Sequence, residues 1–151
     1  MNVAGPGGCE RLRYSHFAIG EFQSAASDLS KVLKARPSSA YPALLLYLAQ
    51  TKTGDRNAFN ELRENTQSLE KAEWPFAAAE LFLRERSPEA TLAATSNLEE
   101  RCEAEFYIAE FEESQGRKFE AIQAMQAMAA CPIKLVERHL AEAELQRIRA
   151  N

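Results

Sequence analysis

Few residues of this 151-residue chain have the types and spacing that metal binding or nucleophilic catalysis requires. The cysteines are Cys9, Cys102 and Cys131, and because none of them forms a CxxC pair, the sequence offers no zinc or thioredoxin-type site. The histidines, His16 and His139, fall near opposite ends of the chain, so they would not share a metal ion or a cysteine in an extended fold. We therefore expect no metal and no cofactor.

Catalytic sequence motifs are also missing. The chain has no G-x-S-x-G, H-E-x-x-H or phosphate-loop pattern, and the glycines of the N-terminal AGPGG follow no predicted strand. Carboxylates are plentiful, yet none sits in an evident apolar pocket that would shift its pKa. We expect a protein that is not an enzyme. A bound cofactor, or a buried pair of carboxylates with shifted pKa values, would favour catalysis instead.

Glutamates gather on one segment of the chain. They are Glu99, Glu100, Glu103, Glu105, Glu110, Glu112 and Glu113. A run of this kind is typical of a solvated helix face, and it also suits a surface that binds a basic segment of a partner. The sequence leaves both interpretations open.

Two stretches of the chain repeat one helical pattern, and helices of this kind would position the cysteine, histidine and glutamate side chains described above. Residues 20–37 read GEFQSAASDLSKVLKARP, and residues 116–132 read GRKFEAIQAMQAMAACP. In both, apolar residues recur at i, i+1, i+4, i+7 and i+8, which is the period of an amphipathic helix and not of a strand. Glycine permits the tight turn that opens each stretch, and proline ends the helix.

The stretches before each glycine are also predicted to be helical, so each unit is a helix, a turn, a second helix and a stop. We place the turns near Gly20, Gly54, Ser87 and Gly116, at spacings of 34, 33 and 29 residues. The units lie near residues 8–37, 39–72, 74–97 and 100–132, after a flexible segment over 1–7. A helix over 133–150 would cap the last unit. The sequence therefore predicts one all-α domain over 8–151, with about four helical hairpins and a capping helix.

A period near 34 with glycine, aromatic, alanine and proline residues at set offsets resembles the tetratricopeptide repeat (TPR) family. The matching residues are Gly20, Phe22, Ala25, Leu29 and Pro37 in the first unit, and Gly116, Ala121, Met125 and Pro132 in the last. The resemblance covers roughly residues 8–132 and implies a short right-handed solenoid. The second half is also similar to a subgroup of bacterial TPR proteins, some of which are exported or lipid-anchored adaptors.

The resemblance implies where a partner binds, because the first helix of each TPR unit lines a concave groove for peptides or partner helices. The positions in this phase are Tyr14, Phe17, Tyr41, Leu44, Leu48, Lys52, Trp74, Leu81, Phe106, Glu110 and Glu113. Trp74 also suits the core, as a plug in the irregular third unit. Leu44 and Leu48 belong to a helix that is apolar around most of its surface, so they are groove or core residues.

Cys102 opens the first helix of a predicted hairpin and Cys131 closes the second, which makes them neighbours if the helices are antiparallel. A disulfide forms there if the two Cα atoms lie within about 7 Å, and it would add roughly 3 kcal/mol of stability. The alternative is two small buried side chains without a bond. A disulfide requires an oxidising compartment.

Composition limits the partners and the compartment. The net charge is −4, and no dense run of lysine and arginine is present, so we expect no nucleic-acid binding. No apolar stretch reaches the ~20 residues that a membrane span needs. The N-terminal MNVAGPGGCE lacks the features of a signal peptide, which predicts the cytoplasm. A bonded Cys102–Cys131 pair would predict an exported or periplasmic protein instead.

These features together predict a non-catalytic protein–protein interaction module. Such an adaptor or scaffold would present a rigid concave surface to a peptide or partner helix, and the partner would bear the ordering cost of binding. The alternative is a structural module that associates with itself into a homo-oligomer. It is favoured by the first unit, whose apolar face has no visible N-terminal cover.

Overall fold

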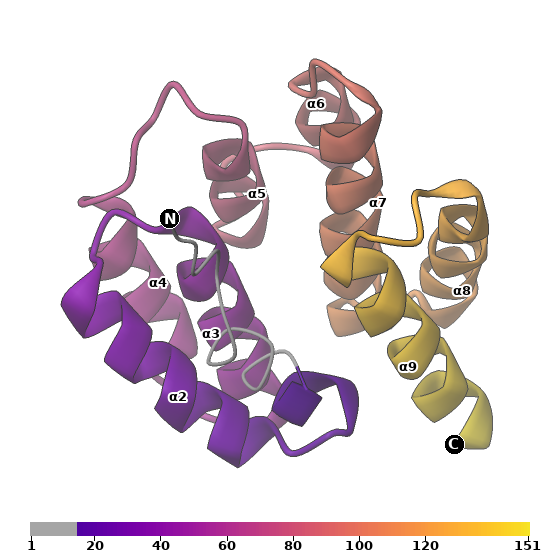
Figure 1. The fold of residues 1–151 in the computed structure, drawn as a ribbon, viewed down its shortest axis with the longest axis horizontal. Helices are drawn as coiled ribbons and strands as arrows, with labels where there is room; N and C mark the ends of the chain where they lie inside the picture. Colours follow the sequence, from indigo (N-terminus) through magenta and orange to yellow (C-terminus); the bar gives the residue numbers. More distant parts are fainter. Residues whose placement is uncertain (1–14) are drawn as a thin grey trace.

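The computed structural model describes residues 15–151, and these residues fold into helices without a strand, as the all-α prediction requires (Figure 1). Residues 15–18 are helical and lead into a turn at Gly20. The elements that follow are α2 (Phe22–Ala35), α3 (Ala40–Lys52), α4 (Ala58–Thr66), α5 (Pro75–Phe82), α6 (Pro88–Ala93), α7 (Leu98–Ser114), α8 (Lys118–Ala127), the 3-10 helix η1 (Met128–Ala130) and α9 (Val136–Ala150).

One turn structure occurs four times among these residues. Gly20, Gly54, Arg84 and Gly116 have φ angles of 83°, 78°, 64° and 79°. The N–H of each donates to the carbonyl three residues earlier at 2.9–3.1 Å, and the N–H of the next residue donates to the carbonyl five residues before it at 2.8–3.0 Å. This pair of bonds is the Schellman motif, which ends a helix with one left-handed residue. Each of the four turns therefore closes a helical hairpin in the same way.

The third turn differs from its predicted position. We placed it near Ser87, but the structure has it at Arg84, so the spacings are 34, 30 and 32 residues. Ser87 is instead the N-cap of α6, and its Oγ accepts a hydrogen bond from the N–H of Ala90 at 3.1 Å. The prediction failed because arginine carries no turn signal. A side chain in the left-handed region costs about 1–2 kcal/mol, and the other three turns avoid this cost with glycine.

The helices pack mainly on the next one or two elements along the chain. α3 contacts α2, α4 and α5, while α7 contacts α5, α6, α8 and α9. In Figure 1, α2, α3 and α4 form one group and α7, α8 and α9 another, with α5 between them. Helix α3 is covered on several sides, because Leu44, Leu45 and Leu46 are each 2% exposed or less.

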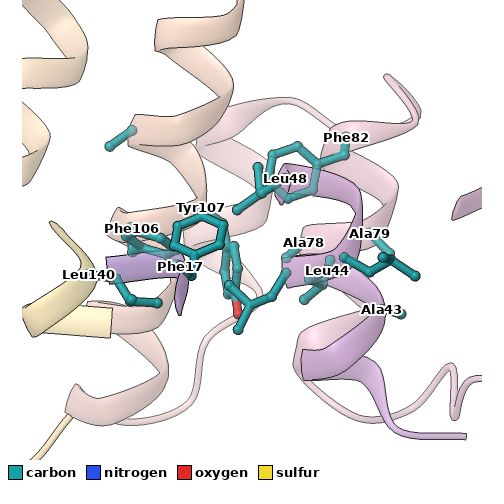
Figure 2. Packing of buried hydrophobic residues seen from close by; sticks show 14 of the residues in the cluster. Phe17, Ala43, Leu44, Leu48, Ala78, Ala79, Phe82, Phe106, Tyr107 and Leu140 are labelled. Carbon is teal, nitrogen blue, oxygen red and sulfur yellow. The ribbon is translucent and has the colours of Figure 1, made fainter. Parts of the chain in front are cut away.

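The first helical segment of the described chain also meets the last helix. Arg147 on α9 donates from Nη1 to the carbonyl of Ala18 at 2.6 Å. Phe17 is fully buried, and in Figure 2 its ring lies among Phe106, Tyr107 and Leu140. The arrangement thus closes on itself, with Phe17 inside.

A disulfide joins the two ends of the α7–α8 hairpin. The sulfur atoms of Cys102 and Cys131 are 2.09 Å apart, and their Cα atoms are separated by 6.0 Å. Cys102 lies near the start of α7, and Cys131 follows η1, in agreement with the predicted pairing. Within residues 15–151, no helix combines the length and apolar character of a membrane span.

Candidate functional site

Most residues predicted to line an open groove lie in the interior. Six of them are between 0% and 3% exposed: Phe17, Leu44, Leu48, Leu81, Phe106 and Glu110. The prediction of an open groove along these helices is therefore wrong for these side chains, because α5 packs against both α3 and α7 and the side chains are buried. Tyr14 lies outside the described residues. Tyr41, Lys52 and Glu113 are partly exposed, and Trp74 is 9% exposed, which makes it a core residue.

A buried carboxylate connects three elements at one end of the inner helices. Glu103 of α7 accepts a hydrogen bond from the Tyr41 hydroxyl of α3 at 2.6 Å. It also accepts one from the indole N–H of Trp74, at the start of α5, at 3.0 Å. Burial raises the pKa of Glu103, although both donors oppose the rise. Glu137 of α9 is 7% exposed, and burial together with the charge of Glu103 raises its pKa to about 7.

A second buried set of charges lies further along the same helices. We call it the Lys52 cluster, and its members are Lys52, Glu110, Glu113, Glu144 and Arg147. Nζ of Lys52 lies 2.9 Å from Glu110 Oε2, 3.3 Å from Glu113 Oε2 and 2.6 Å from Glu144 Oε2. Arg147 donates from Nε to Glu144 Oε1 at 2.7 Å. The cluster therefore links α3, α7 and α9 through ion pairs that are largely shielded from water.

The pKa values of two glutamates in this cluster move in opposite directions. Burial raises the pKa of Glu110 to about 8, and the neighbouring Glu144 adds to the rise while Lys52 opposes it. Burial would also raise the pKa of Glu144, but Lys52 and Arg147 outweigh it and lower that pKa. Burial alone would lower the pKa of Lys52, and the surrounding glutamates reverse the effect and raise it.

Glu110 and Glu144 form a buried pair of carboxylates with shifted pKa values, which would favour catalysis if a substrate could reach them. A carboxylic acid beside a carboxylate can serve as acid and base. Here the side chains of Glu110 and Glu144 are only 1% and 3% exposed, and the Lys52 ammonium group lies against both. Reacting atoms of a substrate would have to come within hydrogen-bond reach of these oxygens. Both side chains border the cavity described below, but Lys52 lies between their carboxylates and each is almost fully covered, which favours an internal ion cluster.

The same geometry bears on metal binding. One carboxylate oxygen from each of Glu110, Glu113 and Glu144 lies within 4.8 Å of the others, a spacing that could hold a cation. The Lys52 ammonium group already lies 2.6–3.3 Å from these three side chains. It supplies the positive charge that the carboxylates need, so the arrangement gives no argument for a metal ion.

An open cavity of 610 Å³ lies beside the Lys52 cluster. Its wall contains residues from the C-terminal ends of α3, α5, α7 and α9, together with Phe22 at the start of α2. The rings of Tyr47 and Phe82 are in contact, with centroids 5.1 Å apart. Lys52 and Arg147 lie over the Phe22 ring at 5.6 Å and 5.2 Å. The cavity thus combines aromatic surface with charged and polar groups.

Sequence reasoning found part of this wall and missed the rest. Of the predicted groove residues, Leu48, Lys52, Glu110 and Glu113 belong to the wall. The residues missed include Phe22, Tyr47, Phe82, Arg84, Glu144 and Arg147. A usable signal was present, because Lys52, Phe82 and Ser114 each precede a turn residue by two positions. That signal depended on finding the third turn at Arg84.

The acidic segment of α7 divides between interior and surface. Glu103 and Glu110 are buried, whereas Glu99 forms an ion pair with Lys134 at 3.2 Å and Glu112 pairs with Arg117. Neither predicted interpretation describes the whole run, since two of its glutamates connect helices inside the fold.

Comparisons with known proteins add no identification. No protein-family model matches the chain, and no curated protein has significant sequence similarity to it.

Proposed function

We propose that this chain is a non-catalytic protein-interaction module with a TPR-like arrangement of helical hairpins. Three observations support the architecture. Four Schellman turns recur at spacings of 30–34 residues, the helices pack on near neighbours along the chain, and α9 lies against the last hairpin as a cap would. The binding surface is not the groove predicted from the repeat phase, because the side chains there are largely interior.

The cavity at the ends of the inner helices is the observation that carries this proposal. It is open to solvent and offers Tyr47 and Phe82 beside charged groups. Aromatic anchors combined with a few polar groups are typical of protein and peptide recognition. Helices held together by a buried core would present this surface without reordering, which limits the entropic cost of binding. We infer that a peptide or a partner helix binds here.

Affinity capture with two matched variants tests the binding surface. Tyr47→Ser removes an aromatic ring from the cavity wall, whereas Phe119→Ser removes a 69% exposed ring outside it. We expect a partner that the wild type and Phe119→Ser retain and that Tyr47→Ser loses. Circular dichroism must show that both variants stay helical. A partner retained equally by Tyr47→Ser and the wild type would contradict the cavity as the binding surface.

A self-associating module is the second candidate, and exposed apolar side chains favour it. Leu98, Phe119 and Ile133 are 61%, 69% and 70% exposed. Contact between copies would cover such side chains. Light scattering over a range of micromolar concentrations decides the matter. A mass that stays at the monomer value would remove this candidate, and a dimer that Phe119→Ser dissociates would establish it.

We also infer that the chain matures in an oxidising compartment, such as the periplasm. The bonding distance between Cys102 and Cys131 supports this, because such bonds rarely persist in the cytosol. Free thiols counted in denatured, unreduced protein from the native source provide the test. We expect one thiol, from Cys9, and a count of three would show that the bond does not form in the cell.

A further inference from the structure

Arg84 occupies a backbone position that favours glycine. Its φ of 64° makes it the one non-glycine residue with positive φ among residues 15–151. The equivalent turn residues are Gly20, Gly54 and Gly116. Arginine at this position strains the backbone, and such strain persists where the side chain serves another purpose.

Stabilisation of helix α5 does not account for this arginine. A cation after the last turn of a helix interacts favourably with the helix dipole, but at an exposed site this gain does not exceed the cost of the backbone strain. Arg86 already brings a guanidinium group to this end of α5, where it pairs with Glu80 at 2.8 Å. A cation at the exposed position 85 would serve the dipole without strain.

The side chain of Arg84 is available to a ligand. Lys52 and Arg147 also line the cavity, but both are held by buried glutamates. The guanidinium group of Arg84 makes no hydrogen bond or ion pair with any residue of the described chain, and the residue is exposed on the cavity wall. The Tyr47 hydroxyl likewise has no hydrogen-bond partner within residues 15–151; burial raises its pKa, and the nearby Arg84 opposes that rise.

We propose that Arg84 gives this cavity its specificity by binding a carboxylate side chain of an acidic partner peptide, while Tyr47 and Phe82 contact an apolar residue beside that carboxylate. This inference rests on the proposed interaction function. A guanidinium group is a planar fork that matches a carboxylate with two parallel hydrogen bonds. The unused Tyr47 hydroxyl offers a further donor. Among the cavity cations described, Arg84 is the one whose charge no glutamate neutralises, so charge complementarity favours an acidic ligand.

Three fluorescein-labelled peptides of equal length provide the test by fluorescence anisotropy. They intersperse leucine and alanine with glutamate, with glutamine or with lysine. We expect the wild type to bind the glutamate peptide at least about tenfold more tightly than the glutamine peptide and to bind the lysine peptide least. The preference for glutamate should weaken in high salt, because screening reduces the attraction.

Arg84→Gly and Arg56→Gly are the matched variants. Arg84→Gly installs the residue that the other three turns use, so it should keep or raise the melting temperature while the glutamate preference is lost. Arg56 is an exposed arginine near the Gly54 turn and outside the cavity, and Arg56→Gly should keep the preference.

The outcomes separate this inference from the function on which it rests. If the peptides bind but Arg84→Gly retains the glutamate preference, or if glutamate and glutamine peptides bind equally, the role of Arg84 is wrong and the interaction module remains. If none of the three peptides binds to the wild type, the cavity is not a peptide site and both proposals fail.

Discussion

Lys52 holds three glutamates from two helices, and its position shows how charge is accommodated inside this fold. A buried ion pair is a poor source of net stability, because two charges must leave water to form it. Removal of one partner is costly, since the other charges then remain buried without compensation. We therefore expect the loss of Lys52 to lower stability by more than the loss of a surface ion pair would.

We predict that Lys52→Met lowers the free energy of unfolding by about 3–5 kcal/mol. The reason is that the three buried or half-buried glutamates would lose the Lys52 ammonium group, and Arg147, which contacts Glu144, would be the one cation left in the Lys52 cluster. Lys134→Met is the control, because its ion pair with Glu99 is largely exposed and should be worth less than about 1 kcal/mol. Urea unfolding of both variants measures the difference. Equal losses would show that the Lys52 cluster contributes no more than a surface pair.

We predict that stability falls as pH rises from about 4.5 to about 8. The pKa values of Glu137 and Glu110 rise from 4.5 to about 7 and about 8 in the folded protein, so folding favours their protonated forms. This contribution is complete below pH 4.5 and is lost as pH passes through 7 and 8. The lowered pKa of Glu144 acts oppositely, and its contribution is lost as pH falls below its unfolded value.

Melting temperatures across this pH range check the prediction. Glu137→Gln should flatten the decline between pH 4.5 and about 7, because the amide has no proton to lose. A melting temperature that rises from pH 6 to pH 9 would contradict the assignment of Glu137 and Glu110 as protonated side chains in the folded state.

These buried glutamates were not predicted, and the reason is physical. Glu103 and Glu110 are seven residues apart on α7, and Glu137 and Glu144 have the same spacing on α9. Helical phase places each pair on one face, but a glutamate is normally assigned to solvent. The information that reverses this assignment is the partner side chain on another helix, and no local pattern contains it.

At the scale of elements, the turns determine where hairpins begin and end. Glycine identified three of the four turns from sequence, since only glycine adopts their backbone freely. The fourth was missed because Arg84 adopts the same conformation at a cost. Sequence therefore predicts a Schellman turn well when glycine occupies the left-handed position, and poorly when another residue such as Arg84 occupies it.

We predict that Gly54→Ala lowers stability by about 1 kcal/mol. A Cβ at this position would meet no atom within 4 Å, so the cost comes from the backbone angle alone. Arg84→Ala is the control, because it changes the side chain without changing the demand on the backbone, and its effect should be within about 0.5 kcal/mol. Chemical denaturation measures both. A loss for Arg84→Ala as large as that for Gly54→Ala would contradict this account.

At the scale of the whole molecule, the hairpins close on themselves where an open groove was expected. Helix α5 has 8 residues, whereas α3 has 13 and α7 has 17. Side chains at the end of α3 can therefore reach α7 past the short helix, as Lys52 does to Glu110 at 2.9 Å. The repeat period predicted the order of packing. The short α5 belongs to the third hairpin, whose sequence was the least regular of the four.

We predict that Arg147→Ala opens the contact between the two ends of the described chain. Arg147 donates to the carbonyl of Ala18 and lies over the Phe22 ring, so its loss should speed hydrogen exchange in residues 15–20 and in α9. Arg149→Ala, at an exposed position on the same helix, is the control. Unchanged exchange in residues 15–20 of Arg147→Ala would show that Phe17 alone holds this contact.

The position of Phe17 also has a consequence for biosynthesis. Its interior neighbours Phe106 and Leu140 are made long after it, and the bond between Ala18 and Arg147 spans 129 residues. At a ribosomal rate of ~5–20 residues per second, Phe17 emerges on the order of ten seconds before these neighbours exist. During that interval an aromatic side chain destined for the core has no folded site. We expect the nascent chain to be a client of chaperones until α9 is complete.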